Sequence, residues 1–102
     1  MGNKEILFVY GTLKDPSVQM EVVGKTIVGS ADVLTGYRKS EIVIDGENYP
    51  AIVPDTKSNV DGLVVYVTRE ELGLIDAYET DVYKRFLIVL KSGKTAWAYA
   101  KR

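Results

Sequence analysis

The hydrophobic positions of this chain fall mostly in short runs of β-branched and aromatic residues, separated by polar turns that contain glycine. The run from Ile6 to Tyr10 is typical of a strand buried on both faces, so the fold is expected to begin with its own central strand. Turns at Asp45-Gly46-Glu47-Asn48 and Ser92-Gly93 favour two β-hairpins. The other expected extended segments are 26–34, 38–44, 49–53, 62–67, 83–90 and 95–100.

Two short helices are predicted between these strands. Asp15-Pro16 is typical of a helix start, because aspartate caps free N–H groups and proline suits the first helical position. Gly24 is then a typical helix end. Thr68 and Glu71 have the spacing of a capping box, which predicts a second helix that runs to about Glu79.

The fold class that follows is α+β. With about six or seven strands, we expect a small, mostly antiparallel β-barrel with two short flanking helices. The 102 residues, of which 46% are hydrophobic, fit a single domain over residues 1–102. The apolar runs are too short for a membrane span, and the first residues lack the apolar stretch of a signal peptide.

Charge and residue usage narrow the classes of function. The net charge is −1, with both signs interspersed, which indicates no binding to nucleic acid or to an anionic membrane. There is no cysteine and no histidine, so the usual zinc ligands, cysteine nucleophiles and histidine-based triads are absent. We expect a cytoplasmic protein without metal or cofactor, in which a carboxylate in an apolar setting carries any acid–base chemistry.

The first strand ends abruptly in the turn Tyr10-Gly11-Thr12-Leu13. Gly11 removes the side chain where the chain must bend, and Thr12 places a hydroxyl beside exposed backbone N–H groups. Such a turn suits a small anion such as a carboxylate, although many purely structural strands also end in Gly-Thr. We predict that Gly11 to Leu13 lie at the mouth of a cavity and leave two or more backbone N–H groups unpaired.

Glu79 is the candidate acid or base. At about 100° per residue, Glu79 falls between Leu72 and Ile75 on the helix stripe that faces the core. An unpaired carboxylate there is costly or has a raised pKa, which is compatible with a functional role. In the alternative, Glu79 ends the helix, turns outward and pairs with Lys84 or Arg85.

Several other side chains have both a structural and a functional interpretation. Asp76, at the edge of the stripe, is expected to be a structural hydrogen-bonding acid. Tyr83 is either a core aromatic with its hydroxyl at the surface or a residue that contacts substrate. Trp97 and Tyr99 share one sheet face and are expected in the core or a pocket wall. The sequence favours a turn that packs into the core, rather than a ligand contact, for the segment Tyr49-Pro50-Ala51.

Taken together, the motifs resemble the gamma-glutamylcyclotransferase-like superfamily, close to its plant avirulence-induced branch and gamma-glutamylamine cyclotransferase-like members. The resemblance covers nearly the whole chain and depends on the joint order of its motifs. These are Tyr10-Gly11-Thr12-Leu13, Gly36-Tyr37-Arg38, Tyr49-Pro50-Ala51-Ile52-Val53-Pro54, Gly62-Leu63, Leu74-Ile75-Asp76-Ala77-Tyr78-Glu79, Tyr83-Lys84-Arg85 and Ala96-Trp97-Ala98-Tyr99.

The resemblance implies a small barrel with a cavity at the end of the first strand. It implies that the turn Tyr10 to Leu13 binds a glutamyl head group, and that Glu79 is the general acid and base. The implied reaction converts a small gamma-glutamyl amide to 5-oxoproline and a free amine or amino acid, without a cofactor. In many members glycine follows the acid, whereas Thr80 and Asp81 follow it here, and Asp81 is expected to raise the pKa of Glu79 or to alter access.

Two further classes of function stay open. One is a non-catalytic domain that retains the cavity and binds an amino-acid-like metabolite. The other is a fold kept only as an interaction module. The sequence favours an enzyme or a binding module, because Glu79 and the turn Tyr10 to Leu13 are both present. The sequence specifies neither the leaving amine nor the oligomeric state.

Overall fold

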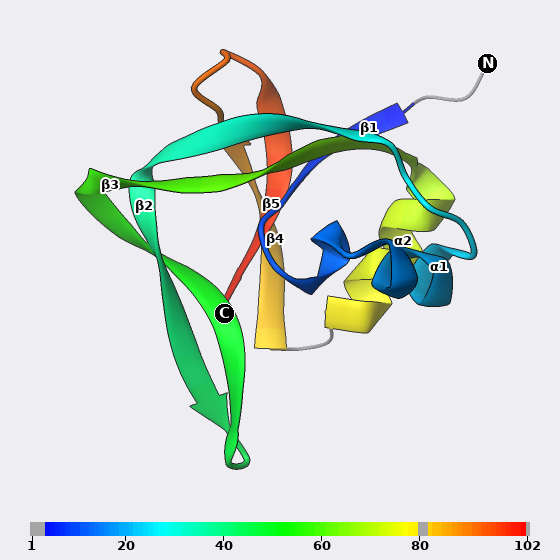
Figure 1. Cartoon of the computed structure of the whole chain (residues 1–102), viewed down its shortest axis with the longest axis horizontal. Coiled ribbons are helices and arrows are strands. Elements are labelled where there is room, and N and C mark those ends of the chain that lie inside the picture. Colours follow the sequence, from blue (N-terminus) through cyan, green and yellow to red (C-terminus); the bar gives the residue numbers. More distant parts are fainter. Residues whose placement is uncertain (1–3, 80–81, 102) are drawn as a thin grey trace.

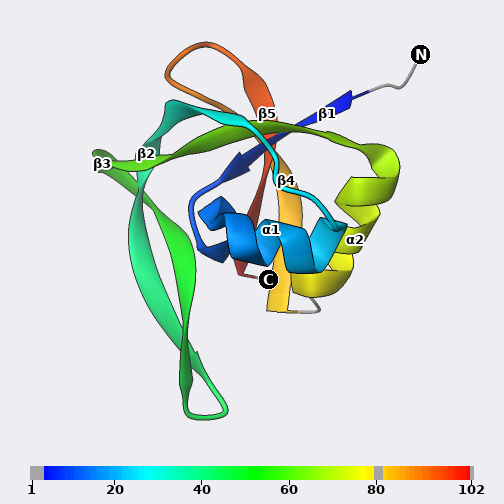
Figure 2. The same cartoon turned by 45° about the vertical axis from the view of Figure 1, so that its right-hand side comes forward.

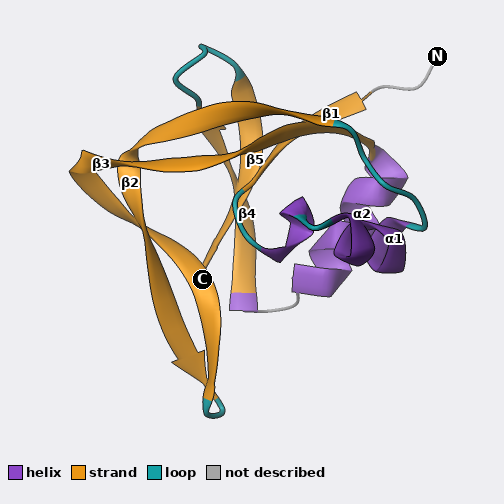
Figure 3. Cartoon of the chain, viewed as in Figure 1, coloured by secondary structure: helices purple, strands orange, loops and turns teal. Residues whose placement is uncertain are grey.

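The computed structural model describes residues 4–79 and 82–101, which form a curled five-stranded sheet with helices against one face (Figures 1 and 3). The strand order is β2-β3-β1-β5-β4, and every neighbouring pair is antiparallel except β1 with β5. The elements are β1 (Lys4–Val9), a 3₁₀ helix η1 (Thr12–Lys14), α1 (Pro16–Val23), β2 (Gly29–Ile44), β3 (Glu47–Thr68), α2 (Arg69–Glu79), β4 (Tyr83–Val89) and β5 (Thr95–Lys101).

The predicted α+β class and the mostly antiparallel curled sheet are confirmed, but the strands are fewer and longer than expected. Segments 26–34 and 38–44 contribute to one strand, β2, and segments 49–53 and 62–67 belong to β3. The strand continues through Gly36, which takes a positive φ of 83° beside a shift in register. A bulge of this kind bends a strand without ending it, so glycine here marks a corner of the curl.

The curled sheet is a half-barrel, in which the first and last strands of the order are not neighbours. Strands β2 and β4 form its two edges. The turn between β4 and β5 nevertheless reaches β2, where the Lys91 amide donates to the Val33 carbonyl at 2.8 Å. Beside it, the Ser92 hydroxyl donates to the Asp32 carboxylate at 2.5 Å. The hairpin of β2 and β3 extends away from this contact (Figures 1 and 2).

Both helices begin as their sequence signals predict. The Asp15 carboxylate accepts from the Ser17 amide at 2.9 Å, and Gly24 ends α1 with a positive φ of 78°. At α2, the Thr68 amide donates to Glu71 at 2.8 Å and the Glu71 amide donates back to Thr68 at 3.1 Å. This reciprocal pair fixes the rotation of α2, and therefore which of its side chains face the sheet.

Strand β1 lies in the middle of the sheet, with apolar side chains on both faces, as its composition predicted. Phe8 belongs to the core inside the curl, whereas Leu7 and Val9 belong to the core between the sheet and the helices. Leu72 and Ile75 of α2 pack into this second core. Figures 1 and 2 show α1 and α2 side by side on that face. The end of β1 therefore opens beside the end of α2.

Candidate active site

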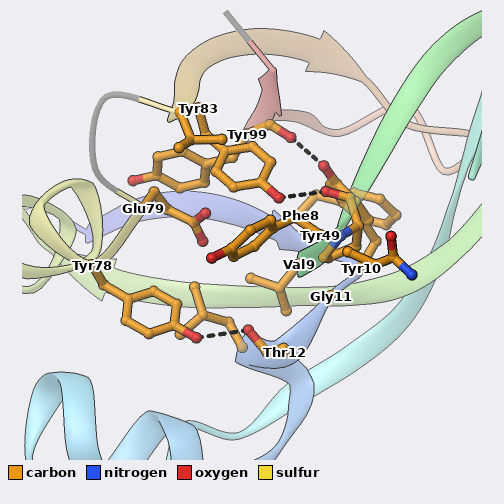
Figure 4. A pocket seen from close by; sticks show the side chains of 14 residues that line it. Phe8, Val9, Tyr10, Gly11, Thr12, Tyr49, Tyr78, Glu79, Tyr83 and Tyr99 are labelled. Carbon is orange, nitrogen blue, oxygen red and sulfur yellow. Dashed lines mark hydrogen bonds between the residues drawn. The ribbon is translucent and has the colours of Figure 1, made fainter. Parts of the chain in front are cut away.

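A pocket of about 480 Å³ lies at the carboxyl end of β1, where the resemblance had placed a cavity (Figure 4). Six elements contribute residues to it: the end of β1, η1, the start of β3, the end of α2, β4 and β5. Five of the seven tyrosines of the chain lie in its wall. The lining residues are Phe8, Val9, Tyr10, Gly11, Thr12, Leu13, Asn48, Tyr49, Pro50, Tyr78, Glu79, Val82, Tyr83 and Tyr99.

Glu79, the last residue of α2, points its carboxylate into this pocket (Figure 4). Burial, followed by the nearby charge of Asp76, raises its pKa from 4.5 to about 7. The alternative pairing with Lys84 or Arg85 is not observed within residues 4–79 and 82–101, because Lys84 is exposed and Arg85 pairs with Asp76. The carboxylate therefore changes charge near neutral pH inside a largely apolar pocket.

Asp76 is a structural hydrogen-bonding acid, as predicted from its position at the edge of the stripe. One carboxylate oxygen accepts from the Tyr99 hydroxyl and lies 3.2 Å from Nε of Arg85. The Arg85 guanidinium in turn lies 4.3 Å from the centre of the Trp97 ring. This network joins α2 to β4 and β5. Of the two acids Asp76 and Glu79, Glu79 is therefore the one that faces the cavity.

The turn after β1 leaves backbone donors free, as predicted. The hydrogen bonds within it run from the Lys14 amide to the Gly11 carbonyl and from the Asp15 amide to the Thr12 carbonyl. The donors of these two bonds are the amides of Lys14 and Asp15, and the amides of Gly11, Thr12 and Leu13 donate to no acceptor in the described part of the chain. A Cβ on Gly11 would lie 3.3 Å from Cγ of Pro50, so glycine also allows the hairpin to approach closely.

Tyr83 and Tyr10 contribute rings to the pocket, while their hydroxyls tie its wall together. The Tyr83 hydroxyl donates to the Pro50 carbonyl at 2.5 Å, and the Tyr10 hydroxyl donates to the Tyr99 carbonyl at 2.5 Å. Tyr83 as a whole is only 9% exposed, and the first of these bonds holds its hydroxyl against the Pro50 carbonyl in the pocket wall. Burial raises the pKa of Tyr83 to about 12 and raises the pKa of Tyr10 as well, so both remain donors.

Some lining residues were not predicted. Tyr49 and Pro50 were interpreted as a turn and core plug, yet they lie in the pocket wall, whereas Ala51 is in the core as expected. Tyr99 lies in the pocket wall, as one of its two expected locations. Tyr78 falls off the apolar stripe of α2, and its 40% exposure explains why periodicity missed it. The effect expected of Thr80 and Asp81 lies outside the described residues.

No part of the described chain suggests a metal site or a membrane span. Within residues 4–79 and 82–101, acidic side chains do not gather in groups of three that could hold a metal ion. In the same ranges, neither helix is long and apolar enough to cross a membrane.

Solved structures share this fold. A protein from Arabidopsis thaliana, solved in solution, superposes with a TM-score of 0.82 at 28% identity, over 96% of this chain and 68% of that one. A structure described as a gamma-glutamyl cyclotransferase superposes with a TM-score of 0.72 over 98% of this chain and 68% of that one. At 13% identity, the second likeness shows the fold alone.

Sequence comparison gives a closer relationship. The chain is 35% identical to AIG2-like protein A of Arabidopsis thaliana over 83 residues, which are 80% of this chain and 49% of that protein. The chain thus spans about half the length of the curated relatives it matches. Residues 7–102 match the family described as "Gamma-glutamyl cyclotransferase, AIG2-like". The match covers almost the whole chain, and the protein belongs to this gamma-glutamyl cyclotransferase family.

Proposed function

We propose that this protein is a gamma-glutamyl cyclotransferase, which converts a gamma-glutamyl amide to 5-oxoproline and a free amine or amino acid. The observation that carries the proposal is the burial of Glu79 in the pocket and the raised pKa of its carboxylate. Its carboxylate is largely buried, has no counter-ion within the described residues, and has a pKa raised to about 7. A carboxyl group with a pKa near the working pH is suited to both accept and return a proton.

The reaction needs little beyond a bent substrate and one acid–base group. The α-ammonium of the substrate loses a proton to Glu79 and becomes an amine, which attacks the γ-carbonyl carbon of the same molecule. A carbon–nitrogen bond forms the five-membered ring, and the amide carbon–nitrogen bond breaks. Glu79 returns its proton to the departing nitrogen, and the second proton of the α-nitrogen also ends on the released amine. The protein supplies a bent conformer and one mobile proton.

The turn after β1 is the proposed site for the anionic group of the substrate. The amides of Gly11, Thr12 and Leu13 have no partner in the described chain, and they border the same pocket as Glu79. Backbone donors of this kind bind a carboxylate or a developing oxyanion without a positively charged side chain. The rings of Tyr10 and Tyr83 close the wall around the substrate.

The direct test is release of 5-oxoproline from a panel of gamma-glutamyl amino acids, gamma-glutamylamines and glutathione. Glu79→Gln keeps the shape of the side chain and removes its basicity, so turnover should fall by about 10²–10⁴-fold. Binding of 5-oxoproline to the variant should persist, because the contacts of the turn are unchanged. The matched control is Glu70→Gln, which alters an exposed glutamate on the same helix. Equal rates for wild type and Glu79→Gln would exclude the mechanism.

A non-catalytic binding module on the same fold is the second candidate. It is favoured by the pocket itself, whose free amides in the turn Gly11 to Leu13 suit a glutamate-like anion whether or not chemistry follows. This function would be indicated by binding of 5-oxoproline or glutamate without any product from the substrate panel.

A further inference from the structure

A hydrogen bond joins the helix of the acid to the turn of the free amides. The hydroxyls of Tyr78, on α2, and Thr12, in η1, lie 2.8 Å apart (Figure 4). The bond lies at the rim of the pocket, because both residues line it and both are exposed at its edge. Tyr78 directly precedes Glu79, so one helix end holds both the acid and this contact.

The turn is anchored strongly on one side of Thr12. Leu13 is buried, and its carbonyl accepts from the Gln19 side chain at 2.8 Å. On the other side, the Gly11 carbonyl accepts from the Lys14 amide within the turn itself, so this bond does not tie Gly11 to α2. Among the residues described, the bond to Tyr78 is the hydrogen bond that links this turn to α2.

We propose that Tyr78 is a positioning residue, whose hydroxyl holds Thr12 so that the amides of Gly11, Thr12 and Leu13 converge on the anionic group of the ligand. This inference rests on the proposed function, in which the anion is the α-carboxylate of a gamma-glutamyl substrate. Tyr78 acts through Thr12 and does not touch the reacting atoms. Its loss should weaken binding and leave the chemical step unchanged.

A different arrangement would use the Thr12 hydroxyl as a direct ligand contact, with Tyr78 as a mere neighbour. The two arrangements predict different patterns of mutants. If Tyr78 acts through Thr12, then Tyr78→Phe and Thr12→Val remove the same interaction, and the double variant is no worse than either single one. If Thr12 contacts the ligand directly, Thr12→Val costs more than Tyr78→Phe.

The kinetic test compares KM and kcat on whichever substrate of the panel is turned over. Tyr78→Phe should raise KM about three- to tenfold, with kcat changed by less than about twofold, as expected for one neutral hydrogen bond lost from binding. Thr12→Val should match it, and Thr12→Ser, which keeps the hydroxyl, should raise KM less than Thr12→Val does. Tyr66→Phe is the control, because Tyr66 is 44% exposed on β3 and lies outside the pocket lining.

A second measurement needs no ligand. In ¹⁵N relaxation of the free protein, Tyr78→Phe should lower the order of the amides from Gly11 to Leu13 and leave those of β1 unchanged. Unchanged order in this variant, additive losses in the double variant, or a fall in kcat alone would overturn the inference. If wild type neither releases 5-oxoproline nor binds it or glutamate, the proposed function fails, and the relaxation result alone decides whether Tyr78 positions the turn.

Discussion

Gly62 on β3 shows how closely the middle of the sheet packs behind the pocket. A Cβ at this position would lie 2.5 Å from the Val9 carbonyl oxygen and 2.6 Å from the ring of Phe8. Phe8 is only 1% exposed and has no room to move aside. Any relief must therefore shift the end of β1, which leads directly into the turn at Gly11.

Gly62→Ala should lower the free energy of unfolding by about 1–3 kcal/mol, because the added methyl group overpacks the core. The matched variant is Gly73→Ala on α2, where an added Cβ meets nothing within 4 Å. Gly73→Ala should raise the free energy of unfolding by about 0.5–1 kcal/mol, because glycine is costly inside a helix. Chemical denaturation measures both, and a neutral Gly62→Ala would contradict the close packing described here.

Single residues differ in how far the sequence predicts their place. Glu79 was predictable, because helical periodicity is local and puts it between Leu72 and Ile75 without knowledge of any other element. Tyr49 and Pro50 were not predictable, because their place in the wall depends on long-range contacts. For example, the Pro50 carbonyl accepts a hydrogen bond from the hydroxyl of Tyr83, which lies 33 residues further along the chain.

Two of the acids on helix α2, Asp76 and Glu79, lie three residues apart and have different surroundings. Asp76 bonds to Tyr99 and Arg85, whereas Glu79 faces the pocket without an ion pair within the described residues. The residues facing Glu79 from other elements are tyrosines, at positions 10, 83 and 99. Burial raises their pKa values, so they stay neutral and leave Asp76 as the charge that acts on Glu79.

Asp76→Asn should therefore lower the pKa of Glu79 below about 7. The substitution removes the negative charge that disfavours ionisation of Glu79, and it leaves the positive charge of Arg85 uncompensated, which acts in the same direction. NMR titration of the glutamate carboxyl carbons measures this shift. Glu70→Gln, on the exposed side of the helix, should leave the titration of Glu79 unchanged. An unchanged Glu79 pKa in Asp76→Asn would show that burial alone sets it.

At the level of elements, the sequence predicted where the helices begin better than it predicted how far each strand continues. The caps at Asp15 and Thr68 are local signals and were confirmed. Gly36, between the expected segments 26–34 and 38–44, is compatible with either a turn or a sharp bend, because a sequence alone does not distinguish a strand end from a bulge. In the structure, pairing of β2 with β3 continues on both sides of this residue.

At the level of the whole molecule, the pocket is made by parts of the chain that meet only in the folded state. The end of β1 and the end of α2 meet because both helices cover one face of the curled sheet. The start of β3 joins them through the bond from Tyr83 to the Pro50 carbonyl. When a buried acid in such a place is ionised, it lowers the free energy of unfolding of the whole molecule.

The last prediction concerns this cost. The pKa of Glu79 is about 7 in the folded protein and near 4.5 in the unfolded chain. Below pH 4.5 both states hold the proton and Glu79 imposes no penalty. Between pH 4.5 and 7 the unfolded state ionises first, so the free energy of unfolding falls as the pH rises, by up to about 3 kcal/mol. Glu79→Gln has no such ionisation and should not show this part of the decline.

Denaturation of wild type and Glu79→Gln at a series of pH values isolates the effect, because all other titrating groups are common to both proteins. The difference in free energy of unfolding should be small near pH 4, grow in favour of Glu79→Gln up to about pH 7, and then level off. Glu70→Gln should show no such trend, since Glu70 is exposed. A difference that stays constant from pH 4 to pH 8 would mean that Glu79 ionises equally in both states, which would also remove the basis for its proposed role as acid and base.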